Sequence, residues 1–288
     1  MTSTLPALEA DWLGACRRAV AGLEQILSDA ATTDERARET GSRGSGGDRT
    51  LVIDESAESV VFAELDALKA EGHKFTALSE ERGEIDYGDS SVRVIIDPID
   101  GSLNAKRGLP HHALSIAVAE GSTMADVVFG FVQDFGPDEE WVAWRGRGAE
   151  LDGRRLDASL GERRGRYGKL ELVGFESAEP RWMRESAEAL AEVAGRVRAI
   201  GAIAVSLCQV AAARFDGMAS LKGCRAVDAA AGQLIVREAG GRVAFTAYDD
   251  PLAAPLDLEP HSPVVAARTA AGLAELARVP SWERAPSD

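Results

Sequence analysis

The segment from Val92 to Asn104 reads VRVIIDPIDGSLN and guides the interpretation of the whole chain. Its run of β-branched residues through Ile96 predicts a buried strand. Asp97 ends that strand, and Pro98 removes a backbone donor, which stops the hydrogen-bonded ladder. Gly101-Ser102 suit a tight turn that enters a helix.

Two carboxylates, Asp97 and Asp100, therefore leave a strand end just before the free N–H groups of an expected helix. Such an arrangement can hold hard cations and a phosphate together. An acidic turn after a strand is the competing interpretation, because Asp-Pro and Asp-Gly are common turn dipeptides. The segment alone leaves both interpretations open.

The chain as a whole is acidic. It has 288 residues, a net charge of -15 and a pI of about 4.8. Its length suits one large or two medium domains with a sizeable core. The negative charge argues against a nucleic acid or an anionic membrane as partner, because both are polyanions. An acidic protein that handles phosphate needs cations to mediate the contact.

The cysteines and the N-terminus bear on the compartment. Cys16, Cys208 and Cys224 are unclustered and odd in number, which fits small buried hydrophobes and reduced thiols. The first residues, MTSTLPALEADW, lack the basic and apolar regions of a secretion signal. No apolar run approaches the length that spans a bilayer. We therefore expect a cytoplasmic protein.

The N-terminal half, residues 1–160, predicts an α+β arrangement with an antiparallel sheet. Leu8 to Leu27 shows the spacing of an amphipathic helix, and GSRGSGG at Gly41 to Gly47, which includes Arg43 of open role, predicts a flexible loop. Asp54 follows a short strand and fits a helix N-cap. The expected elements are a strand at Thr50–Ile53, a helix at Glu55–Lys69, strands at Lys74–Leu78, Ala113–Ala119 and Val127–Val132, and a hairpin from Glu140 through the Asp152-Gly153 turn to Leu156.

The C-terminal half, residues 161–288, alternates strands and helices, which predicts an α/β arrangement. Ala158 to Gly168 is polar and charged, and we place the domain junction there. The expected strands are Lys169–Phe175, Val197–Ile200, Gly217–Leu221, Val243–Thr246 and Val264–Ala267, and the expected helices are Pro180–Ala194, Ala202–Arg214 and Asp228–Ala239.

Several carboxylates stand at expected strand ends or helix starts. They are Glu80-Glu81, Asp97, Asp100 and Asp228. Carboxylates with water and substrate phosphate are the ligands of Mg²⁺, whereas no spacing typical of a zinc site occurs. Taken singly, Glu80-Glu81 also fits a solvated loop and Asp228 an N-cap. His111 and His112 are adjacent in an expected strand, so at most one of them faces the site.

Two other phosphate chemistries fit poorly. Phosphatases with an aspartyl nucleophile place a second Asp two residues after the first, whereas Asp97 and Asp100 are three apart. A covalent aspartyl-phosphate route is therefore disfavoured. The chain also lacks the GxxxxGK[ST] motif of P-loop nucleotide hydrolases.

Three ordered motifs give the chain a family resemblance. They are Ser79-Glu80-Glu81, Asp97-Pro98-Ile99-Asp100-Gly101-Ser102 and Val227-Asp228-Ala229-Ala230-Ala231-Gly232. In this order they resemble the inositol monophosphatase superfamily of Mg²⁺-dependent, lithium-sensitive phosphomonoesterases. The resemblance extends over roughly residues 8 to 270. It implies the layered αβαβα sandwich of the inositol monophosphatase/fructose-1,6-bisphosphatase type.

The resemblance also implies roles for the matching residues, with two or three Mg²⁺ ions. Glu80, Asp97 and the carbonyl of Ile99 would hold the first ion. Asp97, Asp100 and Asp228 would hold the second, and a third would lie near Glu80. The backbone N–H groups of Gly101 and Ser102 would bind phosphate. Ser102 and Asp54, with Glu80, would assist the attack of water.

The substrate is less well defined. A glutamate that contacts inositol in many members is matched here by Leu221, so strict inositol specificity is in doubt. The Arg225-Ala226-Val227-Asp228 version looks closest to the archaeal-type branch, which acts on inositol monophosphate and fructose 1,6-bisphosphate. The expected substrate contacts are Gly201, Ala202, Lys222 and Arg225, and either cation fits a second phosphate or a surface ion pair.

We therefore expect hydrolysis of a small phosphate ester. Inositol 1-phosphate and fructose 1,6-bisphosphate are nearly equal candidates, and adenosine 3′,5′-bisphosphate is third. A non-catalytic regulatory member of the same fold is the alternative from a different functional class. The complete carboxylate set argues against that alternative. Because members of the family commonly dimerise, we expect a homodimer.

Overall fold

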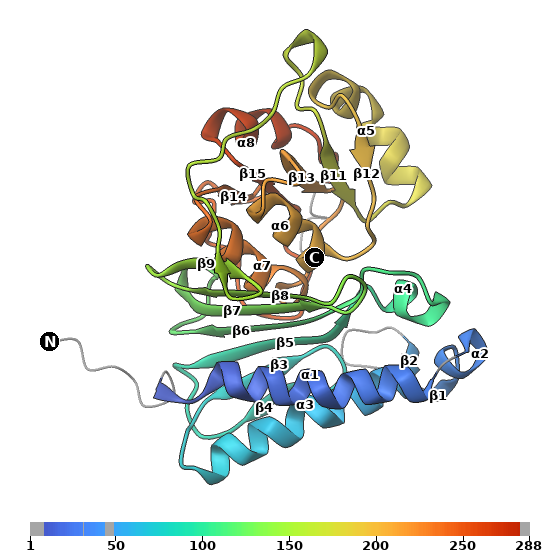
Figure 1. The fold of residues 1–288 in the computed structure, drawn as a ribbon, viewed down its shortest axis with the longest axis vertical. Coiled ribbons are helices and arrows are strands. Elements are labelled where there is room, and N and C mark those ends of the chain that lie inside the picture. The colour runs from blue at the N-terminus through green and yellow to red at the C-terminus, as the bar shows by residue number, and fades with distance from the viewer. Residues whose placement is uncertain (1–8, 31, 44–48, 283–288) are drawn as a thin grey trace, which may run out of the picture.

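The computed structural model describes residues 9–30, 32–43 and 49–282, and these residues form five layers (Figure 1). Helices α1 (Trp12–Asp29) and α3 (Val52–Ala70) cover one face of an eight-stranded sheet. Helices α6 (Ile203–Ala211) and α7 (Ala226–Glu238) lie between that sheet and a five-stranded one. Helices α5 (Pro180–Val193) and α8 (Ala270–Leu276) cover the far side. The expected αβαβα sandwich is confirmed.

The eight-stranded sheet has the order β10-β9-β8-β7-β6-β5-β3-β4. Only the β3–β5 pair is parallel, and all other neighbours are antiparallel. The strands are β3 (Thr76–Ser79), β4 (Gly83–Asp86), β5 (Arg93–Asp100), β6 (Ala113–Ala119), β7 (Val127–Asp134), β8 (Glu139–Trp144), β9 (Gly148–Leu151) and β10 (Arg154–Arg155).

The five-stranded sheet has the order β12-β11-β13-β15-β14. Strand β11 runs parallel to both of its neighbours, and the β13–β15–β14 part is antiparallel. The strands are β11 (Val173–Glu176), β12 (Val197–Arg198), β13 (Gly217–Ser220), β14 (Arg242–Phe245) and β15 (Val264–Ala267).

Strand β5 lies between two hydrophobic cores. Val94 and Ile96 belong to the core shared with α1 and α3. Ile95 belongs to the core shared with α6 and α7. Because side chains alternate across a strand, Asp97 lies on the same face as Ile95 and is directed toward the helices of the central layer. The two-residue period of β5 thus brings the N-terminal carboxylates to the C-terminal helices.

The segment before α3 differs from expectation. The strand expected at Thr50–Ile53 is wrong in its second half, because β2 (Arg49–Leu51) ends and α3 begins at Val52. Asp54 therefore stands inside the first turn of α3 and not at its N-cap. The first residues of the loop expected at Gly41–Gly47 belong to strand β1 (Glu39–Arg43), which pairs with β2. Residues 44–48 and the side chain of Arg43 lie outside the described part.

Other boundaries also move. Helix α4 (Ser102–Arg107) begins where the tight turn predicted it. His111 and His112 precede β6, so their expected place in a strand is wrong. The strand expected at Lys169–Phe175 contracts to β11, because Leu170 forms only isolated bridges. The short elements α2 (Thr33–Arg36), β4 and α8 were not expected, whereas the Asp152-Gly153 turn is confirmed between β9 and β10.

The halves of the chain share a core. Residues of the eight-stranded sheet, such as Trp141, pack in one cluster with residues of α6 and α7, such as Leu207 and Leu234. The division at residue 160 into two domains stays a prediction. Within the described residues, none of the helices has the length and apolar character to cross a membrane.

Candidate metal centre and phosphate site

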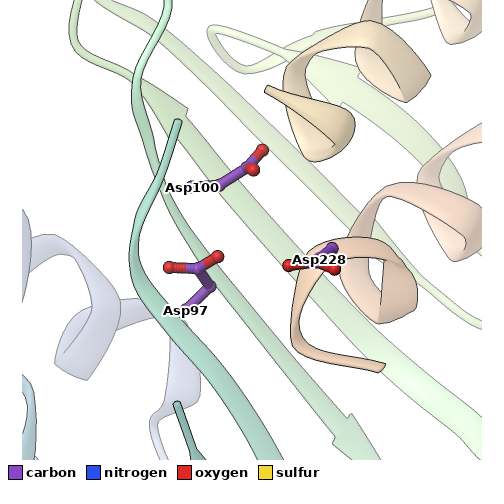
Figure 2. A group of neighbouring side chains, drawn as sticks. All are labelled: Asp97, Asp100 and Asp228. Atoms are coloured by element: carbon purple, nitrogen blue, oxygen red, sulfur yellow. The ribbon is translucent and has the colours of Figure 1, made fainter. Parts of the chain in front are cut away.

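Three carboxylates meet where β5 ends beside α7 (Figure 2). One oxygen from each of Asp97, Asp100 and Asp228 lies within 4.8 Å of the others. Burial and the neighbouring carboxylates raise the pKa of Asp97 well above its usual range. Burial and the Asp228 carboxylate do the same for Asp100. Like charges at this spacing need a cation or protons to remain buried together.

The end of β5 explains how two of these carboxylates share one site. The pairing of β5 with β6 shifts register between Asp97 and Asp100. Pro98 cannot donate to the ladder at that point, and Asp97 Oδ1 instead accepts the backbone N–H of Ile99 at 3.0 Å. The irregular strand end turns both side chains toward the central helices, which regular alternation would not do for residues three apart.

Asp100 is tied to the start of helix α6. Its carboxylate oxygens accept the backbone N–H groups of Ile203 at 3.3 Å and Ala204 at 2.7 Å. These donors belong to the positive end of the helix dipole and favour the ionised carboxylate. They lower the pKa of Asp100, although burial raises it by more. The same bonds fix the position of α6 against the sheet.

Asp228 lies in the first turn of α7. The helix begins at Ala226 after the N-cap residue Arg225, so the N-cap alternative for Asp228 is wrong by three residues. Asp228 Oδ2 reaches back to accept the backbone N–H of Arg225 at 2.8 Å. This bond resembles one half of a capping box. It leaves Asp228 close to the strand carboxylates.

Glu80 follows β3 and faces an arginine. Its Oε1 accepts from Arg225 Nη1 at 2.7 Å, and Arg225 Nη2 lies 3.5 Å from Asp228 Oδ1. Burial raises the pKa of Glu80, and the Arg225 charge opposes that rise. Burial disfavours the Arg225 cation, but the Asp228 and Glu80 carboxylates outweigh it and raise the pKa of Arg225. The expected substrate contact Arg225 thus stands among the expected metal ligands.

The two expected helpers of water attack lie beside the same strand end. Asp54 and Ser102 line a small cavity together with Glu80, Asp97 and Ile99. Ser102 Oγ donates to the carbonyl oxygen of Ile99 at 3.0 Å. The Ser102 hydroxyl and the Asp54 carboxylate therefore line the same cavity as three of the expected ligand residues.

The expected phosphate-binding turn is tightly enclosed. Gly101 is the N-cap of α4 and has a φ of 85°, in the left-handed region. A Cβ there would lie 3.0 Å from the His111 carbonyl oxygen and 3.1 Å from both the Gly201 carbonyl oxygen and Ala202 Cβ. The first N–H groups of a helix have no partner within it. The expected substrate residues Gly201 and Ala202 thus lie against the expected phosphate turn.

Two buried polar residues that hold the loop at Ile200 and Gly201 were not anticipated. Glu176, at the end of β11, accepts the N–H groups of Ile200 at 3.0 Å and Gly201 at 2.9 Å. Asn104 Nδ2 donates to the carbonyl oxygens of Ile200 at 2.7 Å and His111 at 3.0 Å. Glu176 ends an apolar strand, which is the signal that identified Asp97. Asn104 carries no comparable signal.

Lys222 has different neighbours. Its Nζ lies 3.9 Å from Glu179 Oε2, and 46% of its side chain is exposed. Glu179 is the N-cap residue of α5. Of the expected substrate contacts, Gly201, Ala202 and Arg225 contact the turn or its carboxylates, whereas this ion pair draws Lys222 toward α5.

The donor set fits a hard divalent cation. Asp97, Asp100 and Asp228 supply only oxygen, which suits Mg²⁺ and not soft metals. The described cysteines Cys16, Cys208 and Cys224 are buried and free, and burial raises the pKa of each thiol. The clustered carboxylates are therefore the part of the described chain best suited to hold a metal.

Comparisons with known proteins show which proteins the chain resembles. "Nus factor SuhB" of Haemophilus influenzae is 37% identical over 195 residues, which cover 66% of this chain and 69% of that relative. "Fructose-1,6-bisphosphatase/inositol-1-monophosphatase" of Thermococcus kodakarensis is 33% identical over 237 residues, which cover 82% of this chain and 84% of the relative.

Solved structures extend the likeness to the fold. The MJ0109 gene product, described as an inositol monophosphatase-fructose 1,6-bisphosphatase, has a TM-score of 0.78 at 25% identity, covering 94% of this chain and all of the other. The sequence model of the "Inositol monophosphatase family" matches residues 10–280. The chain therefore belongs to the inositol monophosphatase family.

Proposed function

We propose that this protein is a Mg²⁺-dependent phosphomonoesterase that acts on small polyol or sugar phosphates. The observation that carries the proposal is the buried group of Asp97, Asp100 and Asp228 oxygens within 4.8 Å of one another. It lies beside a turn whose helix N–H groups can receive a phosphate. Asp97, Asp100, Asp228, Glu80 and the Ile99 carbonyl would hold two or three Mg²⁺ ions.

Bound Mg²⁺ would supply positive charge and lower the pKa of water at the reacting phosphate. The chain's own residues position the reactants. Gly101 and Ser102 offer backbone N–H groups to the phosphate oxygens. Asp54 and the Ser102 hydroxyl would orient the attacking water within the shared cavity, and the Asp54 carboxylate would accept its proton. Catalysis then depends on position and charge, and no covalent phosphoenzyme forms.

The substrate class rests on the residues around the phosphate turn. Leu221 has an aliphatic side chain that is buried in the core with Leu170 and Val265, so it cannot give a substrate hydroxyl the hydrogen bond that a glutamate would. A cavity of about 560 Å³ lined by Asn104, His111 and Ile200, among others, gives the organic part of a substrate room beside the loop. These features support inositol 1-phosphate and fructose 1,6-bisphosphate as nearly equal substrates, with adenosine 3′,5′-bisphosphate third.

A second phosphate would be held by a cation outside the carboxylate group. Lys222 suits this role better than Arg225, because its ion pair with Glu179 is long and half exposed. Exposed pairs of this kind contribute little to stability and exchange partners readily. Lys222→Ala should therefore lower turnover of a bisphosphate more than turnover of a monophosphate. Equal losses for both substrates would refute this role.

The test of the function is phosphate release from a substrate panel. Inositol 1-phosphate, fructose 1,6-bisphosphate and adenosine 3′,5′-bisphosphate are assayed with Mg²⁺ and after chelation. The proposal expects Mg²⁺-dependent release from one of the first two and its loss in Asp97→Asn. No release from any of the three at any Mg²⁺ concentration would overturn it.

A regulatory role is the second candidate. The observation that favours it is the name "Nus factor SuhB" carried by relatives 36% and 37% identical to this chain. A binding role would not need the carboxylates. If wild type and Asp97→Asn complement a deletion strain equally well, the binding role is favoured over catalysis.

We also propose a homodimer in the cytoplasm. Leu103 and Leu109, in and just after α4, are 67% and 52% exposed and supply apolar contact area. Light scattering is expected to give twice the chain mass, and Leu103→Glu should shift it toward the monomer. The three free cysteines of the described chain fit a reducing compartment.

A further inference from the structure

Arg225 occupies an unusual position for a residue of a metal site. Its guanidinium donates to Glu80 at 2.7 Å and lies 3.5 Å from Asp228 Oδ1. Only 21% of its side chain is exposed. It is therefore held in place from two sides and is not a surface cation that happens to point inward.

The charges around Arg225 explain why it stays there. Asp97, Asp100 and Asp228 converge in one group, and Glu80 lies across Arg225 from Asp228. Among the described residues, Arg225 is the cation that contacts these carboxylates. Neighbouring carboxylates that are largely shielded from water repel one another strongly when they have no counter-charge. One guanidinium neutralises part of that charge and satisfies a carboxylate by a charge-assisted hydrogen bond.

The contacts of Arg225 are unevenly distributed over the carboxylates. The guanidinium bonds Glu80 directly and touches Asp228 weakly, while Asp97 accepts from Ile99 and Asp100 from α6. The Glu80 side of the site is thus already paired with a cation, whereas Asp97 and Asp100 are not. A divalent cation beside Glu80 would face the same-sign guanidinium at close range.

We propose that Arg225 is an internal counter-ion that holds Glu80 until a metal ion binds there. Arg225 must leave Glu80 for that ion to be held. With Arg225 in place, the Glu80 side of the site therefore binds metal more weakly than it would without that charge. This inference rests on the proposed Mg²⁺ site, and it assigns to Arg225 a positioning role that depends on its charge.

The test is metal binding by Arg225→Gln, measured by calorimetric titration with Mg²⁺ and no substrate. Wild type should show saturable Mg²⁺ binding. In Arg225→Gln this binding should tighten by about tenfold, because one buried positive charge no longer competes. Arg93→Gln is the matched control. The Arg93 side chain is 20% exposed and pairs with Glu84 at 3.4 Å. Arg93→Gln removes one positive charge, as Arg225→Gln does, and this variant should bind metal as wild type does.

Thermal unfolding separates this role from ordinary support of the fold. Without metal, Arg225→Gln should melt below wild type, because the carboxylates lose their counter-ion. With saturating Mg²⁺ the difference should shrink or reverse, since ligand binding to the folded state adds stability. A purely structural arginine would lower both melting temperatures equally. If Arg225→Gln does not fold without metal, Arg225→Met, which removes the charge and keeps a flexible unbranched side chain, is titrated instead and should tighten by a similar factor.

The outcomes distinguish this inference from the proposed function. If neither wild type nor any variant binds Mg²⁺, the metal site itself is wrong. If wild type binds Mg²⁺ and the Arg225 variants bind with unchanged or weaker affinity, the site stands and the counter-ion role is refuted. Tightening in Arg93→Gln as large as in Arg225→Gln would also refute it, because the effect would then come from net charge alone.

Discussion

The Asp100 carboxylate lies 2.7 Å from the backbone N–H of Ala204, so the last residue of β5 also caps helix α6. Asp97, three residues earlier, accepts only the local N–H of Ile99 among the described residues. Asp100 therefore also joins the sheet to the central helices, whereas Asp97 does not. Variants of the two should separate catalysis from stability.

Asp97→Asn should lower the rate of Mg²⁺-dependent phosphate release by about a hundredfold or more. It should also raise the melting temperature of the metal-free protein. The reason for the second effect is that burial and three nearby carboxylates oppose the charge of Asp97. Residues that an active site needs commonly lower the stability of the folded protein. Asp100→Asn should lose activity equally but gain less stability, because α6 stabilises its charge. A melting temperature lowered by Asp97→Asn would contradict this account.

Gly101→Ala should destabilise the protein and remove activity. A residue other than glycine at a φ of 85° is strained by about 1–3 kcal/mol, and the added Cβ would press on the His111 and Gly201 carbonyl oxygens. Gly108→Ala is the control, with a φ of 67° and nothing within 4 Å of its Cβ. Urea unfolding should show the larger loss for Gly101→Ala. Equal losses would mean that the enclosure of the turn is unimportant.

Glu176→Gln should change how stability depends on pH. Burial raises the pKa of Glu176 from 4.5 to about 7, although Ser206 and two backbone N–H groups oppose the rise. The folded protein then holds this proton more tightly than the unfolded chain does. The contribution of Glu176 is complete below pH 4.5 and is lost as the pH rises through about 7.

Glutamine does not titrate, so the advantage of wild type over Glu176→Gln should fall across that window by about 3 kcal/mol. Urea unfolding at several pH values measures the difference. Parallel profiles for the two proteins would show that Glu176 keeps one protonation state throughout.

Ser102→Ala should lower kcat by about hundredfold while leaving Mg²⁺ affinity within a few-fold. The Ser102 hydroxyl lines the cavity with Asp54 and donates to the Ile99 carbonyl. Ser102→Thr keeps the hydroxyl and should retain most of the activity. If Ser102→Ala weakens metal binding and leaves kcat unchanged, the hydroxyl acts by fixing the Ile99 carbonyl and not by orienting water.

The central features of the fold were predictable from local sequence because their signals are strong. The run before Asp97 is apolar and β-branched and forms β5 as expected. The boundary at Val52 was not predictable, because Val52 and Ile53 favour a strand by propensity but enter α3 in the structure. Tertiary packing overrides weak propensity in such short segments.

The site was predictable to the extent that its residues stand at strand ends or helix starts. Asp97, Asp100 and Asp228 were anticipated on that basis and are together in the structure. The pairing of Arg225 with Glu80 was not, because it joins residues far apart in the chain: the N-cap residue of α7 and the residue that follows β3. Asn104 was missed for the same reason, since its partners come from another loop.

The position of α6 and α7 between the two sheets has a consequence for synthesis of the chain. Both helices follow every strand of the eight-stranded sheet in sequence, so on the ribosome that sheet is complete before its inner face is covered. That face presents Ile95 and Trp141, and exposed apolar sheets of nascent chains aggregate readily. The covering of this surface also delivers Asp228 to Asp97. A chain that stops before α7 is therefore both aggregation-prone and without its full carboxylate set, so incomplete molecules lack the site proposed for hydrolysis.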